Sequence, residues 1–534
     1  MGIFLYGPPG SGKSSVAKIL AKRLDMPLAD IDRMIEQREG QPISAIFASK
    51  GEGAFREIEK NVIKEIAAGP DAVVALGGGA LLAPESRRLV EHSGEVLFLD
   101  VDREVLAERM SYSPGTRPLV NSDRPQTVFA LLDKRAEHYA SFANRIKVGR
   151  RETVSKVADR IQERLGRFAV KGLSGEYRVD IGNGLLDRVG FAAAALGRVC
   201  RAVLVGDENS MPLYGAKVEK SLSTVGIKVT PVTIPPGEQH KTIATVEGLW
   251  SRFRAVELTR DDLVVALGGG VVGDMSGFAA ACWMRGIRWI NLPTTLLAMV
   301  DAGIGGKTGV DLPEGKNLVG AFHPPAAVLS DTSVLGTLPA REWRCGLAEA
   351  IKHDVLADIG LRYQLGNFRM LRDASPDAVF DGLASEPWLP ELVSKAVAVK
   401  VRVVIADPFE RGIRATLNLG HTIGHALEKV SGFKIRHGEA VAIGTVAAAR
   451  LAQSRSGDLG WSPRAGFLEE LKNAFSSVGL PVDLPEDLDW RMICSAMRND
   501  KKRQQDSVRF VFPYHWGGVK IANEPLSRLE LGLE

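Results

Sequence analysis

The sequence predicts an α/β protein in which two successive strand-and-helix alternations precede a mostly helical region. Apolar strands such as IFLYG and EVLFLDV alternate with helical stretches in the first third of the chain. A second alternation starts at YRVDIGNGLLDRVG (177–190), and from about residue 340 the pattern is almost wholly helical. Strands alternating with helices indicate parallel sheets with crossover helices. A chain of 534 residues is also too long for one ordinary core, so two or three domains are expected.

The domain boundary is expected after a helix over residues 152–166, just before the second alternation begins. The predicted segments are a first domain at 1–166, a linker at 167–174 and a second domain at 175–534. The second domain is expected to consist of an α/β nucleotide-binding part at 175–330 and an all-helical metal-binding part at 331–534.

Composition and charge exclude several classes of protein. The net charge of +4 is small for this length and favours neither nucleic acid nor a membrane surface as a partner. No signal peptide or apolar run of membrane-spanning length is present. The four cysteines are far apart and form no CxxC motif, which favours a reducing cytoplasm.

The first alternation opens with a phosphate-binding motif. GPPGSGKS (7–14) fits G-x-x-x-x-G-K-S, follows a strand and begins a helix, which is the context that such a loop needs. Backbone N–H groups at a helix N-terminus favour phosphate. Lys13 would reach the terminal phosphates of ATP, and the Ser14 hydroxyl would bind magnesium. The predicted nucleotide-binding residues are Gly10, Ser11, Gly12, Lys13, Ser14 and Ser15.

The motifs after this loop resemble shikimate kinase over about 165 residues. They are, in order, ADIDRMIE, GEGAFREIE, LGGG, TRPLV and DKRAEHYASFA. The resemblance implies a nucleoside-monophosphate-kinase-like fold and transfer of the ATP γ-phosphate to the 3-hydroxyl of shikimate. Ser15 stands where that family usually has Thr.

The resemblance also assigns roles to residues of these motifs. Arg56 and Arg135 would bind the substrate carboxylate as paired donors. Asp32 would orient or deprotonate the attacking hydroxyl, and Asp30 would support magnesium through water. Arg117 would close over the phosphates as part of a lid. The backbone expected to contact the substrate ring is that of Gly77, Gly78 and Gly79.

Three of the nine histidines fall within seventeen residues, at His421, His425 and His437. His421 and His425 are four residues apart and share one helical face, and His437 follows a glycine-bearing turn. This spacing suits a divalent metal completed by a carboxylate, for which Glu349 in GLAEAIKHDVL is the candidate. A helix with two structural histidines is the simpler alternative.

Glycine-rich segments before the histidines predict a dinucleotide site beside an anion site. LGGGVVGDMSG follows a strand, so Gly270 and Asp274 allow close approach to a pyrophosphate, although the motif is weak alone. Asp301, Lys307 and Lys316 follow among further glycines, and lysines in such turns suggest phosphate or carboxylate capture.

The second domain resembles 3-dehydroquinate synthase along its whole length. The motifs PPGEQHK, LGGGVVGD, PTTLLA, GGKTGV, GKNLVGAF, GLAEAIK and LNLGHTIGHALE occur in order. The resemblance implies zinc (or cobalt) at Glu349, His421 and His437, with His425 catalytic instead of a ligand. The residues at the family's NAD positions are Glu238, Lys241, Gly270, Asp274, Thr294 and Thr295. Those at its substrate or catalytic positions are Arg285, Asp301, Lys307, Lys316, Asn317, Lys352, Lys400, Arg414, Asn418, His425 and Lys501, of which Lys307, Lys352, Arg414 and His425 are the catalytic candidates.

The resemblance implies conversion of 3-deoxy-D-arabino-heptulosonate 7-phosphate to 3-dehydroquinate and phosphate, with NAD regenerated in each cycle, by a homodimer formed through the synthase domain. Gly303 and Asp311 stand where the family has Ser and Asn. Two alternatives remain. The second domain could be a metal-dependent polyol dehydrogenase that releases NADH, or the first could be a nucleotide-sensing module on one active synthase.

Overall fold

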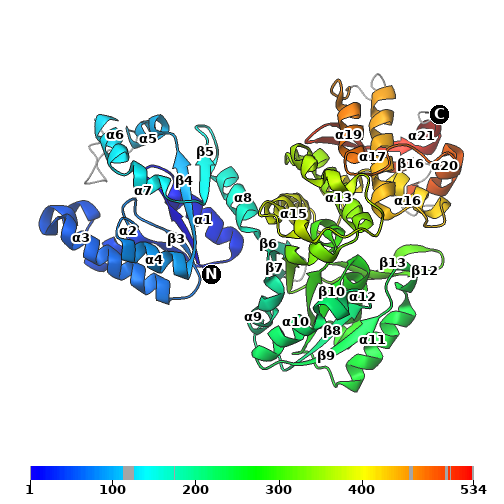
Figure 1. Ribbon diagram of the computed structural model, residues 1–534, viewed down its shortest axis with the longest axis horizontal. Helices are drawn as coiled ribbons and strands as arrows, with labels where there is room; N and C mark the ends of the chain where they lie inside the picture. Colours follow the sequence, from blue (N-terminus) through cyan, green and yellow to red (C-terminus); the bar gives the residue numbers. More distant parts are fainter. Residues whose placement is uncertain are drawn as a thin grey trace. The chain divides into compact units, whose positions relative to one another are not determined.

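The computed structural model describes residues 2–111, 125–172, 175–455, 461–498, 503–504 and 507–531 (Figure 1). The chain divides into two compact units, Met1–Leu165 and Gly166–Glu534, and each has its own sheet and core. No described helix is both long and apolar enough to cross a membrane.

The first unit is a five-stranded parallel sheet in the order β2-β3-β1-β4-β5. Its strands are β1 (Gly2–Tyr6), β2 (Leu28–Asp30), β3 (Val73–Ala75), β4 (Gly94–Val101) and β5 (Arg145–Val148). Its helices are α1 (Lys13–Leu24), α2 (Ile31–Glu39), α3 (Ile43–Ala68), α4 (Pro84–Ser93), α5 (Arg103–Ser111), α6 (Pro125–Lys134), α7 (Ala136–Ala140) and α8 (Val154–Leu165).

Successive side chains of β1 point to opposite faces of the sheet, and helices cover both faces. Ile3 and Leu5 are buried in a cluster with residues of α1 and α8, whereas Phe4 and Tyr6 are buried in a cluster with residues of α2, α3 and α4. A strand buried on both faces reads as a continuous apolar run, as GIFLY does. The expected P-loop α/β fold is confirmed, and the carboxyl ends of its parallel strands meet at one edge of the sheet.

The second unit opens with a seven-stranded sheet in the order β6-β7-β14-β11-β10-β8-β9. Its strands are β6 (Arg167–Gly172), β7 (Gly175–Gly182), β8 (Arg201–Asp207), β9 (Lys228–Ile234), β10 (Leu263–Gly268), β11 (Arg288–Pro293) and β14 (Ala327–Asp331). The hairpin β12 (Lys307–Leu312) and β13 (Gly315–Phe322) forms a separate pair. The accompanying helical segments are η1 (Leu185–Arg188), α9 (Val189–Ala194), α10 (Ser210–Thr224), η2 (Glu238–His240), α11 (Ile243–Ala255), α12 (Gly270–Cys282) and η3 (Trp283–Arg285).

Residues 167–172 correct the predicted linker at 167–174. They form β6, which pairs antiparallel with β7 at the edge of the second sheet. The physical reason is apolar alternation: Phe168 is 5% exposed and Val170 is fully buried in the core of the second unit. The boundary between the two units in the chain lies at Leu165 and Gly166, and residues 167–172 belong to the second unit.

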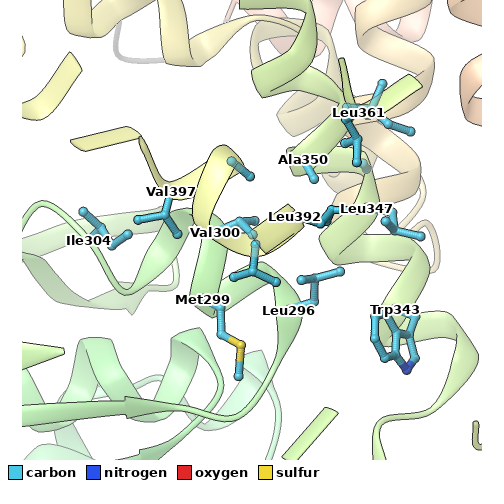
Figure 2. Close-up of a cluster of buried hydrophobic side chains, with 14 of the residues drawn as sticks. Leu296, Met299, Val300, Ile304, Trp343, Leu347, Ala350, Leu361, Leu392 and Val397 are labelled. Atoms are coloured by element: carbon cyan, nitrogen blue, oxygen red, sulfur yellow. The ribbon is translucent and has the colours of Figure 1, made fainter. Parts of the chain in front are cut away.

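The helical part follows β14 and packs on the second sheet. Its segments are η5 (Thr332–Thr337), α13 (Ala340–Ala357), η6 (Leu361–Leu371), α14 (Asp381–Ala384), α15 (Leu389–Ala406), η7 (Ile413–Asn418), α16 (His421–Val430), α17 (His437–Ser454), α19 (Phe467–Ser476), α20 (Trp490–Arg498) and α21 (Leu526–Leu531). Figure 2 shows the buried cluster that joins α13 and α15 to the π-helical turn η4 (Ala298–Ala302). Met299 and Val300 of that turn belong to the same buried cluster as Leu347 of α13 and Leu392 of α15.

This helical part also contains strands, which the sequence pattern did not lead us to expect. They are β15 (Arg503–Gln504), β16 (Ser507–His515) and β17 (Gly518–Pro525), and they form an antiparallel sheet. The sheet packs on α17 through buried Val508, Phe510 and Phe512. Arg455, just after α17, forms a buried ion pair of 2.6 Å with Glu524 of β17.

Candidate active sites

The P-loop lies between β1 and α1. Gly12 precedes α1 with φ 93, a left-handed conformation that glycine adopts without strain. The Lys13 ammonium donates to the carbonyl oxygens of Gly7 at 2.8 Å and Pro8 at 2.9 Å. The loop thus wraps around Lys13, with Ser14 and Ser15 in the first turn of α1. This is the arrangement that presents backbone N–H groups to phosphate.

Asp30 and Asp32 lie at the end of β2 and in the first turn of α2. The Asp30 carboxylate accepts a hydrogen bond from the Arg33 backbone N–H at 3.4 Å and so caps α2. A Cβ on Gly77 would lie 3.2 Å from Asp32 Oδ1 and 2.6 Å from Glu59 Oε1. Asp32 therefore borders the LGGG loop, and a side chain on Gly77 would require the Asp32 and Glu59 carboxylates to shift.

Arg56 and Glu59 form an ion pair of 2.6 Å on α3. Glu59 is 3% exposed; burial raises its pKa, and the neighbouring Arg56 opposes that rise. A Cβ on Gly79 would lie 2.6 Å from Arg56 Nη2, so the guanidinium lies directly against the loop. Glu59 is a functional candidate that the sequence motifs do not single out, although it lies three residues after Arg56 in GEGAFREIE.

Arg135 completes this first site from the N-terminal end of α7. It is 7% exposed, and its Nη1 donates to the Gly78 carbonyl at 2.9 Å. The structure thus brings Asp32, Arg56 and Arg135 together around the Gly77–Gly79 loop. Arg117, the expected lid arginine, lies outside the described residues.

The glycine-rich turn between β10 and α12 lines a cavity in the second unit. The cavity is bounded by Gly269, Gly270 and Asp274, and by Asn291 and Lys307 from other elements. A Cβ on Gly303 would lie 2.7 Å from the Ala298 carbonyl oxygen and 2.9 Å from Asn291 Nδ2. A side chain at Gly303 would therefore crowd the backbone of Ala298 and the side chain of Asn291.

Lys241 links the cavity wall to the β12–β13 hairpin. Its ammonium lies 2.6 Å from Asp274 Oδ2 and 2.6 Å from Asn317 Oδ1, and the residue is 3% exposed. Burial lowers its pKa, but Asp274 and Glu238 outweigh burial, so the pKa is raised and Lys241 stays charged. Asn317 has φ 53, and its backbone N–H donates to Asp311 Oδ1 at 2.7 Å.

Three other residues expected near NAD surround the same region. Glu238 lies 3.6 Å from the Lys316 ammonium. The Thr294 N–H donates to the Gly268 carbonyl at 2.9 Å, which fixes β11 against the glycine turn. Thr295 Oγ1 accepts from the Ala298 N–H at 3.2 Å. Glu238, Thr294 and Thr295 therefore lie after the ends of β9 and β11 and are not among the residues that line the cavity.

Glu349, His421 and His437 converge from α13, α16 and α17. Their nearest donor atoms lie within 4.8 Å of one another, and Glu349 Oε1 lies 3.4 Å from His421 Nε2 and 3.2 Å from His437 Nε2. His421 Nδ1 lies 3.0 Å from the Leu419 carbonyl oxygen. A proton on that Nδ1 leaves Nε2 for a metal. One carboxylate with two imidazoles fits a catalytic zinc site that keeps open positions.

The charge state of this cluster follows from its burial and its carboxylates. Burial lowers the pKa of His421. Burial also acts to lower the pKa of His437, but Glu349 and Glu428 outweigh it and raise that pKa to about 10. Glu428 Oε2 lies 3.7 Å from His437 Nδ1, and Glu428 Oε1 accepts from the Lys316 ammonium at 3.1 Å. Glu428 therefore connects the cluster to the hairpin lysine.

His425 lies beside the cluster, with its ring centroid 5.4 Å from that of His421 and 6.3 Å from that of His437. His425, Glu428 and His437 form a second group with metal-binding geometry. Geometry alone therefore leaves His425 available either as a ligand or as a catalytic base.

A buried charge network extends from the metal cluster to Asp301 on the π-helical turn. Asp301 Oδ1 lies 2.8 Å from the Lys400 ammonium, 3.6 Å from that of Lys352 and 3.4 Å from His353 Nε2. Burial would raise the pKa of Asp301, but Lys352 and Lys400 hold it well below its usual value. Lys352 also contacts Glu349. π-Helical turns occur often at functional sites; here, the turn sends Asp301 inward while its apolar neighbours pack on α13 and α15.

A second group of charges lies near β12. Arg414, 1% exposed, donates to the Pro408 carbonyl at 2.8 Å and the Gly305 carbonyl at 3.3 Å. Glu410 contacts Lys307 and accepts from Asn418 Nδ2 at 3.1 Å. Glu410, Glu428 and His353 are functional candidates that the sequence motifs do not single out. A signal for Glu410 was its place four residues before Arg414 in ERGIR.

The last two expected substrate residues are Arg285 and Lys501. Arg285 follows α12 with a left-handed backbone, φ 67, and the described contacts do not join it to the metal cluster. Lys501 lies outside the described residues.

The fold and the two sites define a P-loop phosphotransferase unit followed by a unit with a small glycine-lined cavity and a metal cluster. Residues 9–166 match the family model of shikimate kinase, 231–345 that of the 3-dehydroquinate synthase N-terminal part, and 346–503 that of its C-terminal part. The 3-dehydroquinate synthase of Gloeobacter violaceus is 44% identical over 361 residues, which are 66% of this chain and 95% of that protein. The Symbiobacterium thermophilum enzyme is also 44% identical, over 65% of this chain and 93% of that protein.

A solved relative shows the same architecture with both cofactors. The 2-epi-5-epi-valiolone synthase of Streptomyces hygroscopicus, with NAD+ and Zn2+ bound, is 27% identical and covers 67% of this chain and 95% of that one, with a TM-score of 0.58. The chain belongs to the 3-dehydroquinate synthase family and carries a shikimate kinase domain ahead of the synthase. The first unit is therefore a shikimate kinase and the second a 3-dehydroquinate synthase. The two alternatives, a nucleotide-sensing module and a polyol dehydrogenase, do not describe them.

Proposed function

We propose that the kinase unit transfers the γ-phosphate of ATP, bound with magnesium, to the 3-hydroxyl of shikimate. The observation that supports this is the convergence of Asp32, Arg56 and Arg135 on the Gly77–Gly79 loop beside Lys13. Arg56 and Arg135 bind the shikimate carboxylate, and Asp32 orients the hydroxyl. Ser14 holds magnesium directly and Asp30 through water. Positioning and charge stabilisation are the main means of catalysing phosphoryl transfer.

We propose that the synthase unit converts 3-deoxy-D-arabino-heptulosonate 7-phosphate to 3-dehydroquinate and phosphate. The observation that carries the proposal is a three-residue metal cluster surrounded by buried cations, next to a glycine-lined cavity. Glu349, His421 and His437 hold zinc or cobalt, and NAD binds against Gly270, Asp274 and Lys241. When bound, the metal polarises substrate oxygens and NAD takes and returns a hydride.

The chain's own residues bind and orient this anionic substrate. Lys307, Lys352 and Arg414 neutralise its phosphate and carboxylate, and Asn418 and Lys400 help to position it. His425 moves the proton that accompanies loss of phosphate. A neutral polyol would not need this concentration of cations around the metal cluster.

Two assays on the purified protein test the pair of functions. ATP with shikimate should yield ADP and shikimate phosphate. The heptulosonate phosphate, with catalytic NAD and zinc, should release stoichiometric phosphate while absorbance at the NADH band rises only transiently. Steady NADH accumulation from a simple polyol, without phosphate release, would refute the proposed synthase reaction.

The proposal extends to the assembly and location of the enzyme. The family resemblance supports a homodimer formed through the synthase unit, which light scattering would distinguish from a monomer. The four free cysteines support a reducing cytoplasm as its location. Fractionation of cells that express the protein would test that location.

A further inference from the structure

The Gly78 carbonyl is the focus of a hydrogen-bond network in the kinase unit. It accepts from Tyr139 OH at 2.8 Å, from Arg135 Nη1 at 2.9 Å and from Tyr6 OH at 3.3 Å. Tyr6 is fully buried, and Tyr139 and Arg135 are 6% and 7% exposed. Three donors on one carbonyl fix the orientation of a glycine peptide that would otherwise have wide conformational freedom.

Tyr6 is in turn held by His138. The Tyr6 hydroxyl lies 3.0 Å from His138 Nε2, and its ring packs against Phe142 at 5.0 Å between centroids. A hydroxyl has one proton to donate, so Tyr6 bonds fully to Gly78 only when His138 donates to the Tyr6 oxygen. The hydrogen bonds then run from His138 through Tyr6 to Gly78. Burial raises the pKa of Tyr6, so its hydroxyl stays protonated.

The fixed carbonyl determines two features of the substrate site. Because the peptide unit is planar and trans, anchoring the Gly78 carbonyl points the Gly79 N–H in the opposite direction. The same carbonyl holds the Arg135 guanidinium. We infer that Tyr6 and His138 are positioning residues for shikimate, which act through Gly78 on the glycine loop and on Arg135. This inference rests on the proposed kinase reaction and adds two residues to its site.

The test begins with Tyr6→Phe, which keeps the ring packing and removes only the hydroxyl. The loss of one hydrogen bond predicts a rise of roughly threefold to tenfold in the KM for shikimate. The KM for ATP and kcat should stay within about twofold, because Lys13 and Asp32 keep their contacts. Tyr214→Phe is the matched control: it removes a tyrosine hydroxyl that donates to the Val334 carbonyl at 2.8 Å in the other unit.

A second pair of variants tests the histidine. His138→Leu removes the group that holds the Tyr6 hydroxyl in place but leaves its proton free to donate to Gly78, so the KM for shikimate should rise by less than in Tyr6→Phe. His138→Gln should restore the KM, because its amide can donate to the Tyr6 oxygen. His138 is only partly buried, so this pair remains informative if Tyr6→Phe does not fold. Equal rises in the KM for ATP and for shikimate would overturn the inference, because Tyr6 would then act through the adjacent Gly7. A lower melting temperature with unchanged KM values would also overturn it, since the role would be purely structural.

The proposed reaction and this inference fail in distinguishable ways. If the wild-type protein does not phosphorylate shikimate, the proposed kinase function is wrong. If the wild type is active and both Tyr6→Phe and His138→Leu keep its KM for shikimate, only the positioning role is wrong.

Discussion

Lys13 and Asp32 are the two residues on which the kinase site depends most directly. Lys13→Ala and Asp32→Asn should each lower shikimate phosphorylation by at least about a hundredfold, because each removes charge or positioning in the transition state. Steady-state turnover with ATP and shikimate measures the loss. Lys18→Ala, an exposed lysine on the same helix, is the control. The synthase rate of the same preparations should be unchanged, and near-normal kinase turnover in either variant would contradict the assignment.

The metal ligands give a second prediction at the scale of residues. Glu349→Gln, His421→Ala and His437→Ala should lose zinc, because each removes one of three protein ligands, whereas His425→Ala should keep it. Metal analysis of the four purified proteins measures this directly. The outcome is informative because His425 also belongs to a second group of possible ligands with Glu428 and His437. Zinc lost from His425→Ala and kept by His437→Ala would reverse the assignment.

Glu428 should strengthen zinc binding without being a zinc ligand. Its carboxylate faces His437 Nδ1 at 3.7 Å and accepts from Lys316 at 3.1 Å. Glu428→Gln removes the negative charge that supports His437 as a ligand, so zinc affinity should fall by about tenfold to a hundredfold. Competition with a chromogenic chelator would measure the zinc affinity of wild type and variant. Lys429→Gln, an exposed change on the same helix, should leave zinc affinity unchanged. An unaltered affinity in Glu428→Gln would show that Glu428 has no such role.

The sequence identified these residues to different extents. Lys13, Asp32, Arg56 and the three histidines stood out because their motifs combine unusual residue types with fixed spacing. Glu59, Glu428 and His353 did not, because a single glutamate or histidine on a helix looks the same whether it faces solvent or a buried cation. Only the packing of α3, α13 and α16 shows that these three are buried.

At the scale of elements, Asp262 joins β8 to β10. The Asp262 carboxylate accepts from the Arg201 backbone N–H at 2.9 Å and the Thr259 N–H at 2.8 Å, and the residue is 3% exposed. Asp262→Asn should destabilise the synthase unit by about 1–3 kcal/mol, because one acceptor becomes a donor facing a donor. Urea unfolding measures the change. Asp261→Asn, on the exposed neighbour, is the control.

The pH dependence of this contribution has a definite sign. Burial would raise the pKa of Asp262, but hydrogen bonds from Thr259 and Arg201 outweigh it and lower the pKa below 3.8. The stabilisation is therefore complete above the unfolded value and is lost as pH falls through the lower folded value. The stability difference between wild type and Asp262→Asn should shrink in that acid range. A difference that grew as pH fell would contradict the assignment.

The sequence predicted the elements that have strong periodicity. The parallel strands of both α/β sheets and the long helices followed from apolar runs separated by glycine turns. RFAVKG is short and comes directly after a helix, so its sequence alone does not distinguish a strand from a linker. Its antiparallel pairing with β7 makes it a strand. The π-helical turn at Ala298–Ala302 has no simple period, so packing against α13 and α15 was needed to show it.

For the whole molecule, the boundary at Leu165 and Gly166 predicts that the units fold independently. Residues 1–165 alone should keep kinase activity, and 166–534 should keep synthase activity and the melting temperature of the synthase unit. A fragment that starts at residue 175 should be markedly less stable, because it loses buried Phe168 and Val170, each worth about 1.5–3 kcal/mol. Calorimetry of the three fragments measures this. Equal stability of the fragments 166–534 and 175–534 would show that β6 is dispensable.

The sheet formed by β15, β16 and β17 bears on the timing of folding during translation. Domains usually fold in order as they leave the ribosome, so the kinase can be complete while the synthase is still being made. The helix that begins at His437 ends beside Arg455, whose buried charge is paired with Glu524, about seventy residues later in the chain. A nascent chain should therefore phosphorylate shikimate before its synthase helices are fully held in place. Ribosome-stalled chains that end before β17 would be expected to have one working enzyme, not two.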